Sequence, residues 1–459
     1  MTHRSFVRRT RLEATAEEAF RWHARPGAFE RLNPPWDPAV VESRSGGIED
    51  EGARVVLRVG PLRQRWVAEH HGAVPGHEFH DRQVRGPFAL WEHAHRVIPE
   101  GPNACTLEDR IEYALPAGAA GDLVAGRAVR ALLDRMFAYR HRVTADDLAA
   151  HAACREGEPM KVVVTGASGL LGSALVPFLT AGGHEVVRLV RRAPRSKDEA
   201  RWDPEAGEID AAALEGTDAV VHLAGENIAG GRWTEARKAL LRSSRVGPTE
   251  LLARALAGLT KKPKVLVSAS AIGYYGNRGD AWVTEKDAPA ADFLGRLSVE
   301  WEAAAEPARK AGIRVVHPRF GIVLSPAGGA LGKMLLPFKA GLGGVVGPGT
   351  QYMSWIALDD VLGVVHHLLD RADLEGPVNA AAPEPVTNAV FTKTLGRVLG
   401  RPTVASVPAF ALRLALGEMA DAALLSSTRV RPERLQASGY RFRFPDLEGA
   451  LRHVLGKPA

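Results

Sequence analysis

The 459-residue sequence predicts two main domains of different class: an α+β domain of antiparallel strands, then an α/β domain with a doubly wound parallel sheet. Three observations predict this. Residues 1–155 contain many short strand-like segments and end in one long helical pattern. Residues 160–400 alternate apolar strands with helical segments, and a glycine-rich turn follows the first of those strands. Residues 401–459 predict helices joined by turns, which would form a small helical C-terminal domain.

The first domain opens with an alternating strand, Phe6 to Leu12, and a short helix where Thr15 and Glu18 stand at capping-box spacing. A long helix with an apolar face closes the domain. Between these elements, Gly, Pro and Asn separate further strand-like segments, as antiparallel hairpins require. The segments are Val40 to Arg44, Arg54 to Val59, Arg65 to His71, Glu78 to Arg85, Leu90 to Ile98 and Thr106 to Tyr113. The apolar face of the helix comprises Val129, Leu132, Leu133, Met136 and Phe137.

The string VVVTGASGLLG at residues 162–172 is typical of a dinucleotide-binding turn. Its glycines permit a tight turn, a close approach of the backbone to a pyrophosphate, and close packing of helix on strand. The N-terminus of the helix that follows offers N–H groups to the phosphates. The alternative is a plain strand-to-helix turn. The predicted cofactor contacts in this turn are Gly166, Ala167, Ser168, Gly169, Leu170, Leu171 and Gly172.

The end of the second strand of this domain predicts which dinucleotide binds. Glu185 to Val190 is followed by Arg191 and Arg192, where an NAD-preferring site usually has an acidic residue for the ribose 2′-hydroxyl. A guanidinium binds the 2′-phosphate of NADP(H), whereas a carboxylate repels it. The pair therefore predicts NADP(H), and the alternative is a solvated basic loop.

From Lys161 onward the chain resembles the extended short-chain dehydrogenase/reductases. The resemblance rests on the TGxxGxxG turn, the HLAG strand end at 222–225 and the SASAIGYYG segment at 268–276. Longer strings, such as AGENIAGGRWTEARKALLRSSR and SWIALDDV, are similar to the atypical, sugar-epimerase-like subgroup of the NAD-dependent epimerase/dehydratase family, which carries a C-terminal domain of unknown function. The resemblance implies a Rossmann domain that binds NADP(H). Besides the glycine turn, it implies cofactor contacts at Arg191, Arg192, Leu223, Ala224 and Arg245.

Residues 1 to about 150 resemble the START-like, polyketide-cyclase-like (SRPBCC) superfamily, through the order of their elements and the string GPFALWEHAH from Gly86 to His95. That resemblance implies a helix-grip fold with a hydrophobic cavity that holds a small apolar ligand between sheet and helix. The alternative is a filled core without a ligand, because fold alone does not settle function.

The catalytic dyad usual in short-chain dehydrogenase/reductases is missing. Those enzymes use Tyr-x-x-x-Lys on a helix, where the ammonium lowers the pKa of the phenol. None of the six tyrosines of this chain is followed four residues later by lysine. Ser270 stands at the superfamily's catalytic serine or threonine position, and either Tyr274 or Tyr275 could donate the proton. The alternative is that the two tyrosines only line the pocket. Arg319, at the end of a later strand, reaches cofactor or substrate, or else forms a surface salt bridge.

Two further regions of the second half have an expected role. The glycine-rich residues 326–350 predict a mobile loop region on the substrate side. Asp359 and Asp360 open the helix that follows, and we expect them to be structural, because acidic residues suit a helix N-terminus.

Composition and spacing argue against several other classes of site. His93 and His95 would share one face of a strand, but no carboxylate or thiol stands beside them at a recognisable ligand spacing, so we expect ordinary hydrogen-bonded histidines and no metal. The alternative is a metal site, because imidazoles two residues apart on a strand can both reach one ion. Cys105 and Cys154 form no CxxC pair. The net charge of +6 comes without a Lys/Arg tract interleaved with aromatic residues, so we expect no nucleic-acid partner.

The sequence contains no apolar segment of signal-peptide or membrane-helix length, so we expect a cytoplasmic protein without a membrane span. The leading hypothesis is an NADP(H)-binding oxidoreductase or epimerase-like protein that acts on an unknown small carbonyl or hydroxyl substrate. Whether it is an enzyme stays open, because the dyad is absent. The alternatives are a non-catalytic NADP(H)-responsive regulator, related to cell division as some relatives are, and a carrier of a hydrophobic ligand.

Overall fold

The computed structural model describes residues 3–60, 63–153 and 159–458. Two compact units are present: residues 1–157 with 177–183 and 458, and residues 158–176 with 184–457 and 459. Cys154 and the predicted end of the first domain at residue 155 lie outside the described residues.

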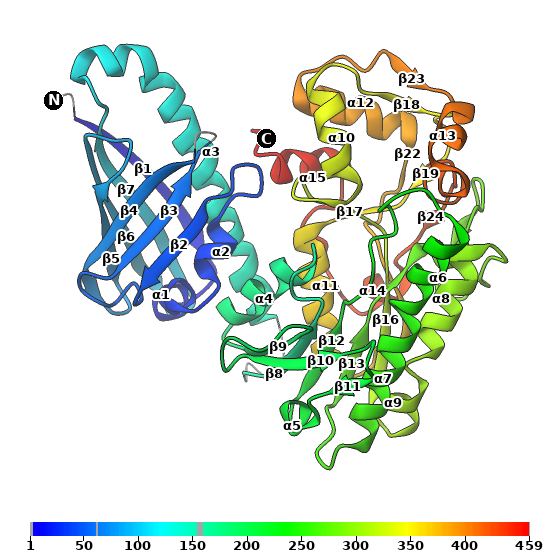
Figure 1. Cartoon of the computed structure of the whole chain (residues 1–459). Coiled ribbons are helices and arrows are strands. Elements are labelled where there is room, and N and C mark those ends of the chain that lie inside the picture. The colour runs from blue at the N-terminus through cyan, green and yellow to red at the C-terminus, as the bar shows by residue number, and fades with distance from the viewer. Residues whose placement is uncertain (1–2, 61–62, 154–158, 459) are drawn as a thin grey trace. The chain divides into compact units, whose positions relative to one another are not determined.

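The first unit is a seven-stranded antiparallel sheet with helices packed on it (Figure 1). The strand order is β1-β7-β6-β5-β4-β3-β2. The strands are β1 (Arg4–Leu12), β2 (Val40–Ser45), β3 (Arg54–Val59), β4 (Gln64–Val74), β5 (Glu78–Arg85), β6 (Leu90–Gly101) and β7 (Ala104–Ala114). The helices are α1 (Ala16–Ala24), α2 (Ala28–Leu32) and the 35-residue α3 (Gly118–Ala152). Every strand predicted from the sequence of this unit is confirmed.

Local signals explain why these elements form. The capping box at the start of α1 is confirmed, since Glu18 N donates to Thr15 Oγ1 over 3.1 Å and Thr15 N donates to the Glu18 carboxylate over 2.9 Å. The face of α3 that carries Leu133 and Phe137 packs on Phe6 of β1 and other core residues. Leu132 was predicted on this face but is 39% exposed, because it lies on the side of α3 that faces solvent.

The second unit is built on a nine-stranded sheet with the Rossmann order β11-β10-β9-β8-β12-β13-β16, and β14 and β21 pair with β16. Its strands are parallel except for the β10–β11 pair. They are β8 (Lys161–Thr165), β9 (Glu185–Val190), β10 (Glu199–Asp203), β11 (Glu208–Ile209), β12 (Ala219–His222), β13 (Val265–Ser268), β14 (Ser270–Ala271), β16 (Arg314–Phe320) and β21 (Gly376–Ala380).

Helices cover both faces of this sheet, which is why its strands are nearly continuous apolar runs (Figure 1). Helices α7 (Val246–Gly258) and α9 (Glu306–Lys310) pack on one face through Leu252, Leu256 and Ala308. Helix α11 (Leu358–Asp370) contacts β13 and β16 from the other face. The remaining helices of the sheet region are α4 (Gly172–Ala181), α5 (Ala211–Leu214), α6 (Glu235–Ser243), α8 (Phe293–Ala303) and the 3-10 helix η1 (Ile272–Tyr275).

A second apolar core joins segments after β16. It includes Leu331, Trp355, Phe391 and Phe444. The helices of this part are α10 (Gly329–Lys339), α12 (Asn388–Leu399), α13 (Ala409–Leu416), η2 (Ala420–Leu424), α14 (Glu433–Ala437) and α15 (Leu447–Val454). The short strands are β15 (Trp282–Val283), β17 (Ile322–Leu324), β18 (Gly344–Val346), β19 (Tyr352–Met353), β20 (Trp355–Ala357), β22 (Val386–Thr387), β23 (Ala405–Val407) and β24 (Arg429–Val430).

The prediction of a loop over residues 326–350 is wrong. Helix α10 and strand β18 occupy most of this region, because Leu331, Leu335 and Phe338 fall on one helical face and are buried. That burial outweighs the low helix propensity of the glycines. No helix in the described part of the chain is long and apolar enough to cross a membrane.

Candidate functional site

The glycine turn after β8 leaves room for backbone only. Gly166 has a φ of +68°, and a Cβ there would lie 2.7 Å from the carbonyl carbon of Leu223. At Gly172 a Cβ would lie 2.3 Å from the Gly166 carbonyl oxygen. Ser168 and Gly169 are exposed at the tip of the turn, and α4 begins at Gly172. A side chain at Gly166 would push the turn away from the end of β12, and one at Gly172 would collide with the turn's own backbone.

Buried hydroxyls hold the strand ends around this turn. Thr165 Oγ1, at the end of β8, accepts from the N–H groups of Leu223 and Ala224, each over 3.2 Å. Nδ1 of His222 lies 2.7 Å from the same hydroxyl, and its Nε2 lies 2.9 Å from Thr249 Oγ1. Burial lowers the pKa of His222 to about 4, so the ring is neutral at pH 7. The predicted contacts Leu223 and Ala224 are thereby fixed beside the glycine turn.

The two arginines after β9 have different surroundings. Arg192 forms two hydrogen bonds to the Glu199 carboxylate, of 2.8 and 2.6 Å. These two hydrogen bonds from Arg192, together with one from the backbone N–H of Arg195, lower the pKa of Glu199 to about 2. Arg191 is exposed, and the ion pairs at this strand end join Arg188 and Arg192 to Asp198 and Glu199 instead. Of these two arginines, Arg191 is the one that a ligand can reach without breaking a salt bridge formed among the described residues.

Arg245 braces the loop that follows β12. Its Nη2 donates to the carbonyl of Glu226 over 2.9 Å, and its Nη1 donates to the carbonyl of Leu241 over 3.1 Å. The guanidinium carbon lies 5.1 Å from the ring centre of Trp301. Burial lowers the pKa of Arg245 to about 10, which still leaves it charged at pH 7.

At the carboxyl edge of the sheet, a buried ion pair joins β16 to α8. Arg319 Nε and Nη2 each donate to a different oxygen of Glu302 over 2.8 Å. Ser270 Oγ donates to Glu302 over 2.7 Å. Arg319 is only 2% exposed, so its interpretation as a surface salt bridge is wrong: its partner lies inside the unit. Burial by itself would lower the pKa of Arg319, but the Glu302 carboxylate outweighs it and raises that pKa.

The same arginine contacts both candidate tyrosines. Arg319 Nη1 donates to Tyr275 Oη over 3.0 Å, and the Tyr275 hydroxyl donates to Asn379 Oδ1 over 2.6 Å. Burial raises the pKa of Tyr275 to about 12, although Arg319 and Asn379 oppose this. Tyr274 is half-buried, and the Arg319 guanidinium carbon lies 3.4 Å from its ring centre. A cation thus stands beside the phenols as the lysine of the usual dyad would, but it comes from β16.

The sequence did not single out Glu302 or Asn379. Glu302 lies near the end of α8, 32 residues after Ser270, and Asn379 lies on β21. Parallel pairing of β14 and β21 with β16 brings Ser270 and Asn379 level with Arg319, since the register matches each of them to it. Ser270, Arg319 and Asn379 all stand near the ends of strands, which is the signal that the sequence offered for Asn379. Glu302, on a helix, gave no such signal.

The predicted structural aspartates do have structural partners. Asp360 accepts from the N–H groups of Arg443 and Phe444 over 2.7 and 3.0 Å, and it lies 3.1 Å from Tyr440 Oη. Burial raises the pKa of Asp360 to about 6 despite these donors. Asp359 Oδ2 lies 2.8 Å from His453 Nε2, so the pair ties the start of α11 to the C-terminal segment.

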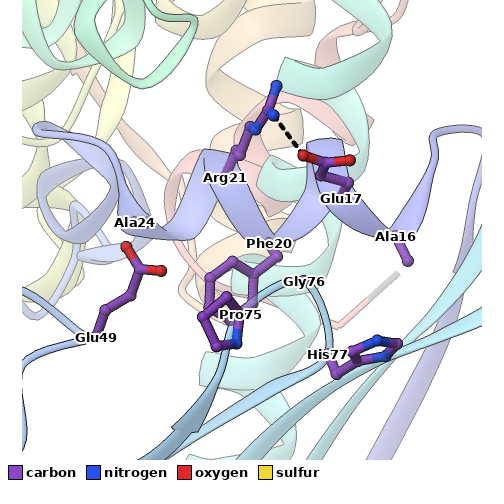
Figure 2. Close-up of a pocket in the computed structure, with 9 residues that line it drawn as sticks. All are labelled: Ala16, Glu17, Phe20, Arg21, Ala24, Glu49, Pro75, Gly76 and His77. Atoms are coloured by element: carbon purple, nitrogen blue, oxygen red, sulfur yellow. Dashed lines mark hydrogen bonds and ion pairs between the residues drawn. The ribbon is translucent and has the colours of Figure 1, made fainter.

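A pocket of about 490 Å³ lies in the first unit, between α1 and the turn before β5 (Figure 2). Its lining is mixed: Phe20 and Pro75 are apolar, whereas Glu17 and Arg21 form an ion pair. The remaining lining residues are Ala16, Ala24, Glu49, Gly76 and His77. This pocket lies along α1, so it differs in place from the apolar cavity expected beneath the closing helix.

Beneath α3, the inner face of the sheet carries a cluster of histidines and aspartates. His93 and His95 of β6 lie on this face, with ring centres 3.8 Å apart. Asp81 of β5 and Asp109 of β7 lie on the strands to either side, in register with His93 and His95 respectively. The histidines are hydrogen-bonded, as expected, and their carboxylate partners come from the neighbouring strands, where no spacing along the chain would indicate them.

Family models match three parts of the chain. They are polyketide cyclase / dehydrase and lipid transport at residues 12–137, the NAD dependent epimerase/dehydratase family at 162–381, and a domain of unknown function (DUF1731) at 407–454. The predicted three-part resemblance is confirmed.

Relatives and solved structures agree with these matches. Epimerase family protein Mb2239 of Mycobacterium bovis is 46% identical over 297 residues, which are 65% of this chain and 98% of that protein. The crystal structure of a nucleoside-diphosphate sugar epimerase from Corynebacterium glutamicum has a TM-score of 0.81 and 33% identity, covering 98% of this chain and 90% of that one. The human epimerase family protein SDR39U1, crystallised with NADPH, has a TM-score of 0.61 and 37% identity, covering 64% of this chain and 99% of that one. With nearly the full length of these relatives matched, the chain belongs to the NAD-dependent epimerase/dehydratase family and carries an N-terminal polyketide-cyclase domain.

Proposed function

We propose that the second unit binds NADP(H) at the glycine turn and transfers hydride between this cofactor and a small carbonyl or hydroxyl compound. The observation that carries the proposal is the tight glycine turn: Gly166 and Gly172 pack directly on backbone, while Ser168 and Gly169 lie exposed at its tip before the start of α4, where a pyrophosphate can approach backbone N–H groups. The NADPH in the crystal structure of human SDR39U1, a relative 37% identical over nearly its whole length, supports the same cofactor here.

Each predicted cofactor contact has a part in this proposal. The exposed tip at Ser168 and Gly169, with the start of α4, would hold the pyrophosphate through backbone N–H groups. Arg191 would bind the 2′-phosphate, while Arg192 stays on Glu199 and orients the loop. Leu223 and Ala224 would line the adenosine side, and Arg245 would support them through the Glu226 carbonyl.

When bound, the nicotinamide would donate or accept the hydride. The matching proton would come from the phenol cluster, and Tyr274 is the phenol we assign to contact the substrate, because Tyr275 is fully buried and donates to Asn379. Arg319 would stabilise negative charge that develops on a substrate oxygen near Tyr274. Ser270, whose hydroxyl donates to Glu302, would position Arg319 through that carboxylate.

Nucleoside-diphosphate sugars are the first substrate class to test. The C. glutamicum relative, which matches both units of this chain, is described as a nucleoside-diphosphate sugar epimerase. Such a sugar offers the hydroxyl that an epimerase must oxidise and reduce again.

A non-catalytic, NADP(H)-responsive regulator is the second candidate. The observation that favours it is that the residues at the usual catalytic positions already have partners: Ser270 and Tyr275 are buried, and both hydroxyls donate hydrogen bonds inside the unit.

We also propose three domains for the chain. They are a helix-grip, apolar-ligand domain over 1–155, a cofactor domain over 160–400, and a small helical substrate-side domain over 401–459.

An equilibrium titration of the full chain with NADPH and, in parallel, NADH tests the cofactor, with tryptophan fluorescence as the readout. We expect NADPH to bind at least ~10-fold more tightly, which is about 1.4 kcal/mol. Arg191→Ala should remove most of that preference, whereas the matched variant Arg192→Ala should change it less, because Glu199 already holds Arg192. If neither nucleotide binds, the proposal fails. A preference that depends on Arg192 alone would reject the role of Arg191.

Turnover separates the two candidates. Absorbance at the NADPH band is followed with NADP⁺ and nucleoside-diphosphate sugars, and with NADPH and their keto derivatives or small carbonyl compounds. Because an epimerase regenerates its cofactor, the sugar products are also separated by chromatography. Substrate-dependent turnover that falls in Tyr274→Phe supports the enzyme. Tight NADPH binding without turnover on any of these compounds favours the regulator.

A further inference from the structure

The cluster on the inner face of the first unit's sheet is a closed ring of four contacts. Asp81 Oδ2 lies 3.0 Å from His93 Nδ1 and 3.3 Å from His95 Nε2. Asp109 Oδ1 lies 2.9 Å from His93 Nε2 and 2.6 Å from His95 Nδ1. Each imidazole therefore has a carboxylate oxygen at both of its nitrogens.

This arrangement requires positive charge between the carboxylates and the rings. A neutral imidazole carries one N–H, so its second nitrogen would turn a lone pair toward a carboxylate. Two such contacts at Asp81, inside the fold, would be repulsive. Either both rings are protonated, or a cation replaces the two protons on the Asp81 side.

We propose that Asp81, His93 and His95 bind one divalent transition-metal ion, with Zn²⁺ as the representative ion. Their three ligand atoms lie within 4.8 Å of one another. Neighbouring ligand atoms around such an ion lie roughly 2.8 to 3.6 Å apart, given bonds of about 2.0 to 2.2 Å in octahedral to tetrahedral geometry. The separations of 3.0 and 3.3 Å at Asp81 fall in this range.

Asp109 supplies the outer support that a histidine-ligated metal needs. A metal-bound imidazole donates its other N–H to a carboxylate, which fixes the tautomer and the ring orientation. Asp109 Oδ1 is placed to accept from both rings. Its other oxygen lies 2.7 Å from His141 Nε2 on α3, and His141 Nδ1 lies 2.9 Å from Thr10 Oγ1.

The surroundings are buried and hold further charged groups. His93 and Asp109 are 3% and 4% exposed, and Phe79 stacks on His95 with ring centres 4.2 Å apart. The other titratable groups that face the cluster are His23 of α1, His70 of β4 and Arg140 of α3. Three protein ligands around an ion leave a position for water or a small anionic ligand, as in catalytic zinc sites. The first unit would then hold a metal centre, independent of the cofactor proposed for the second unit.

Zinc binding to the full chain tests this proposal. The affinity tag is removed, the chain is treated with a chelator, and Zn²⁺ is titrated in competition with a chromophoric chelator. We expect about one Zn²⁺ per chain at micromolar affinity or better, together with release of up to about two protons, measured calorimetrically in buffers of different ionisation enthalpy. His95→Gln and Asp81→Asn should each weaken binding at least ~100-fold, and Asp109→Asn should weaken it ~10- to 100-fold.

Two controls keep the result specific. His71→Gln on β4 removes a histidine that lies beside Glu92 at 3.4 Å, outside the ring of four, and should leave binding unchanged. His184→Gln tests a second pair of imidazoles, since His184 Nε2 lies 3.1 Å from His366 Nε2. Circular dichroism and hydrogen exchange of peptides from β6 and β12 check that both units of every variant are folded.

Three results would overturn the proposal. They are less than ~0.1 Zn²⁺ per chain at excess zinc, affinity unchanged in both His95→Gln and Asp81→Asn, or loss of zinc in His184→Gln alone. If the cluster variants do not fold, the His184→Gln chain still tests the proposal. We expect this chain to bind about one Zn²⁺ with release of protons, and the absence of binding would overturn the proposal.

Discussion

The ion pair at Arg319 and the histidine cluster beneath α3 bury charge in different ways. In the second unit, Glu302 is held by the guanidinium of Arg319, which stays charged at every pH that a protein tolerates. In the first unit, Asp81 and Asp109 are held by imidazoles, which lose their charge near neutral pH unless the fold prevents it. The first arrangement suits a fixed scaffold beside a substrate. The second can exchange its protons, and so it responds to pH or to a cation.

The largest expected effect comes from removing the fixed charge. Arg319→Ala leaves the Glu302 carboxylate buried with Ser270 as its remaining donor, which should destabilise the second unit by about 3–5 kcal/mol. Hydrogen exchange of peptides from β13 and β16 measures this locally. Adding Glu302→Gln should recover part of the loss, because it removes the unpaired charge.

Arg309→Ala is the matched control for this variant. Its pair with Glu306, at 2.7 Å, is exposed on both sides and should contribute at most about 1 kcal/mol. Equal destabilisation by Arg309→Ala and Arg319→Ala would contradict a special role for the buried pair.

The pH dependence of the two units should differ in direction. Burial by itself would lower the pKa of His95, but Asp109 and Asp81 outweigh it and raise it to about 9. The stability from this raised pKa is fully present below about pH 6.5, the unfolded value, and is lost as pH rises through 9. In a chelator, the first unit should therefore lose on the order of 2–3 kcal/mol between pH 6.5 and 9.

The strands of the second unit that carry His222 and His317 should show the opposite trend. Burial lowers the pKa of His222 and of His317 to about 4, so the stability they contribute is present above about pH 6.5 and is lost as pH falls through 4. Hydrogen exchange of peptides from β6 and β12, corrected for the intrinsic rate at each pH, measures both trends in one sample. His95→Gln should flatten the alkaline loss in β6. An alkaline loss of the same size in β12 would contradict the assignment to His95.

What the sequence predicted well is local. The strands of the first unit follow from alternating apolar residues and turn residues a few positions apart, and the capping box at Thr15 and Glu18 lies within four residues. The spacing of the glycine turn is also local, since Gly169 and Gly172 face backbone of the turn itself, although Gly166 faces Leu223 at the end of β12. Family membership followed from similar contiguous strings, and it is confirmed.

What the sequence did not predict depends on register between distant segments. Asp81 meets His93 because β5 pairs with β6, and Asp109 meets His95 because β6 pairs with β7. A search for metal ligands along the chain misses such carboxylates, since cross-strand neighbours have no fixed spacing in sequence. The sequence did not predict Glu302 for a similar reason. Glu302 contacts Arg319 and Ser270 from a helix that lies between their strands in the chain, and no fixed spacing joins the three residues.

The smallest expected effect compares the hydroxyls at the edge of each network. Ser270→Ala removes a 2.7 Å hydrogen bond to a charged carboxylate and should cost about 1–2 kcal/mol in the second unit. Thr10→Val removes the contact with His141 Nδ1, a partner one step further from the carboxylate, and should cost about 0.5–1 kcal/mol in the first. Hydrogen exchange of β14 and β1 peptides measures the two. Because the guanidinium of Arg319 keeps its charge throughout this range, the cost of Ser270→Ala should be constant from pH 6.5 to 9, whereas the cost of Thr10→Val should shrink as the histidine cluster loses protons. A pH-independent cost at both sites would mean that the first unit's network is as fixed as the second's, and the contrast between them would fail.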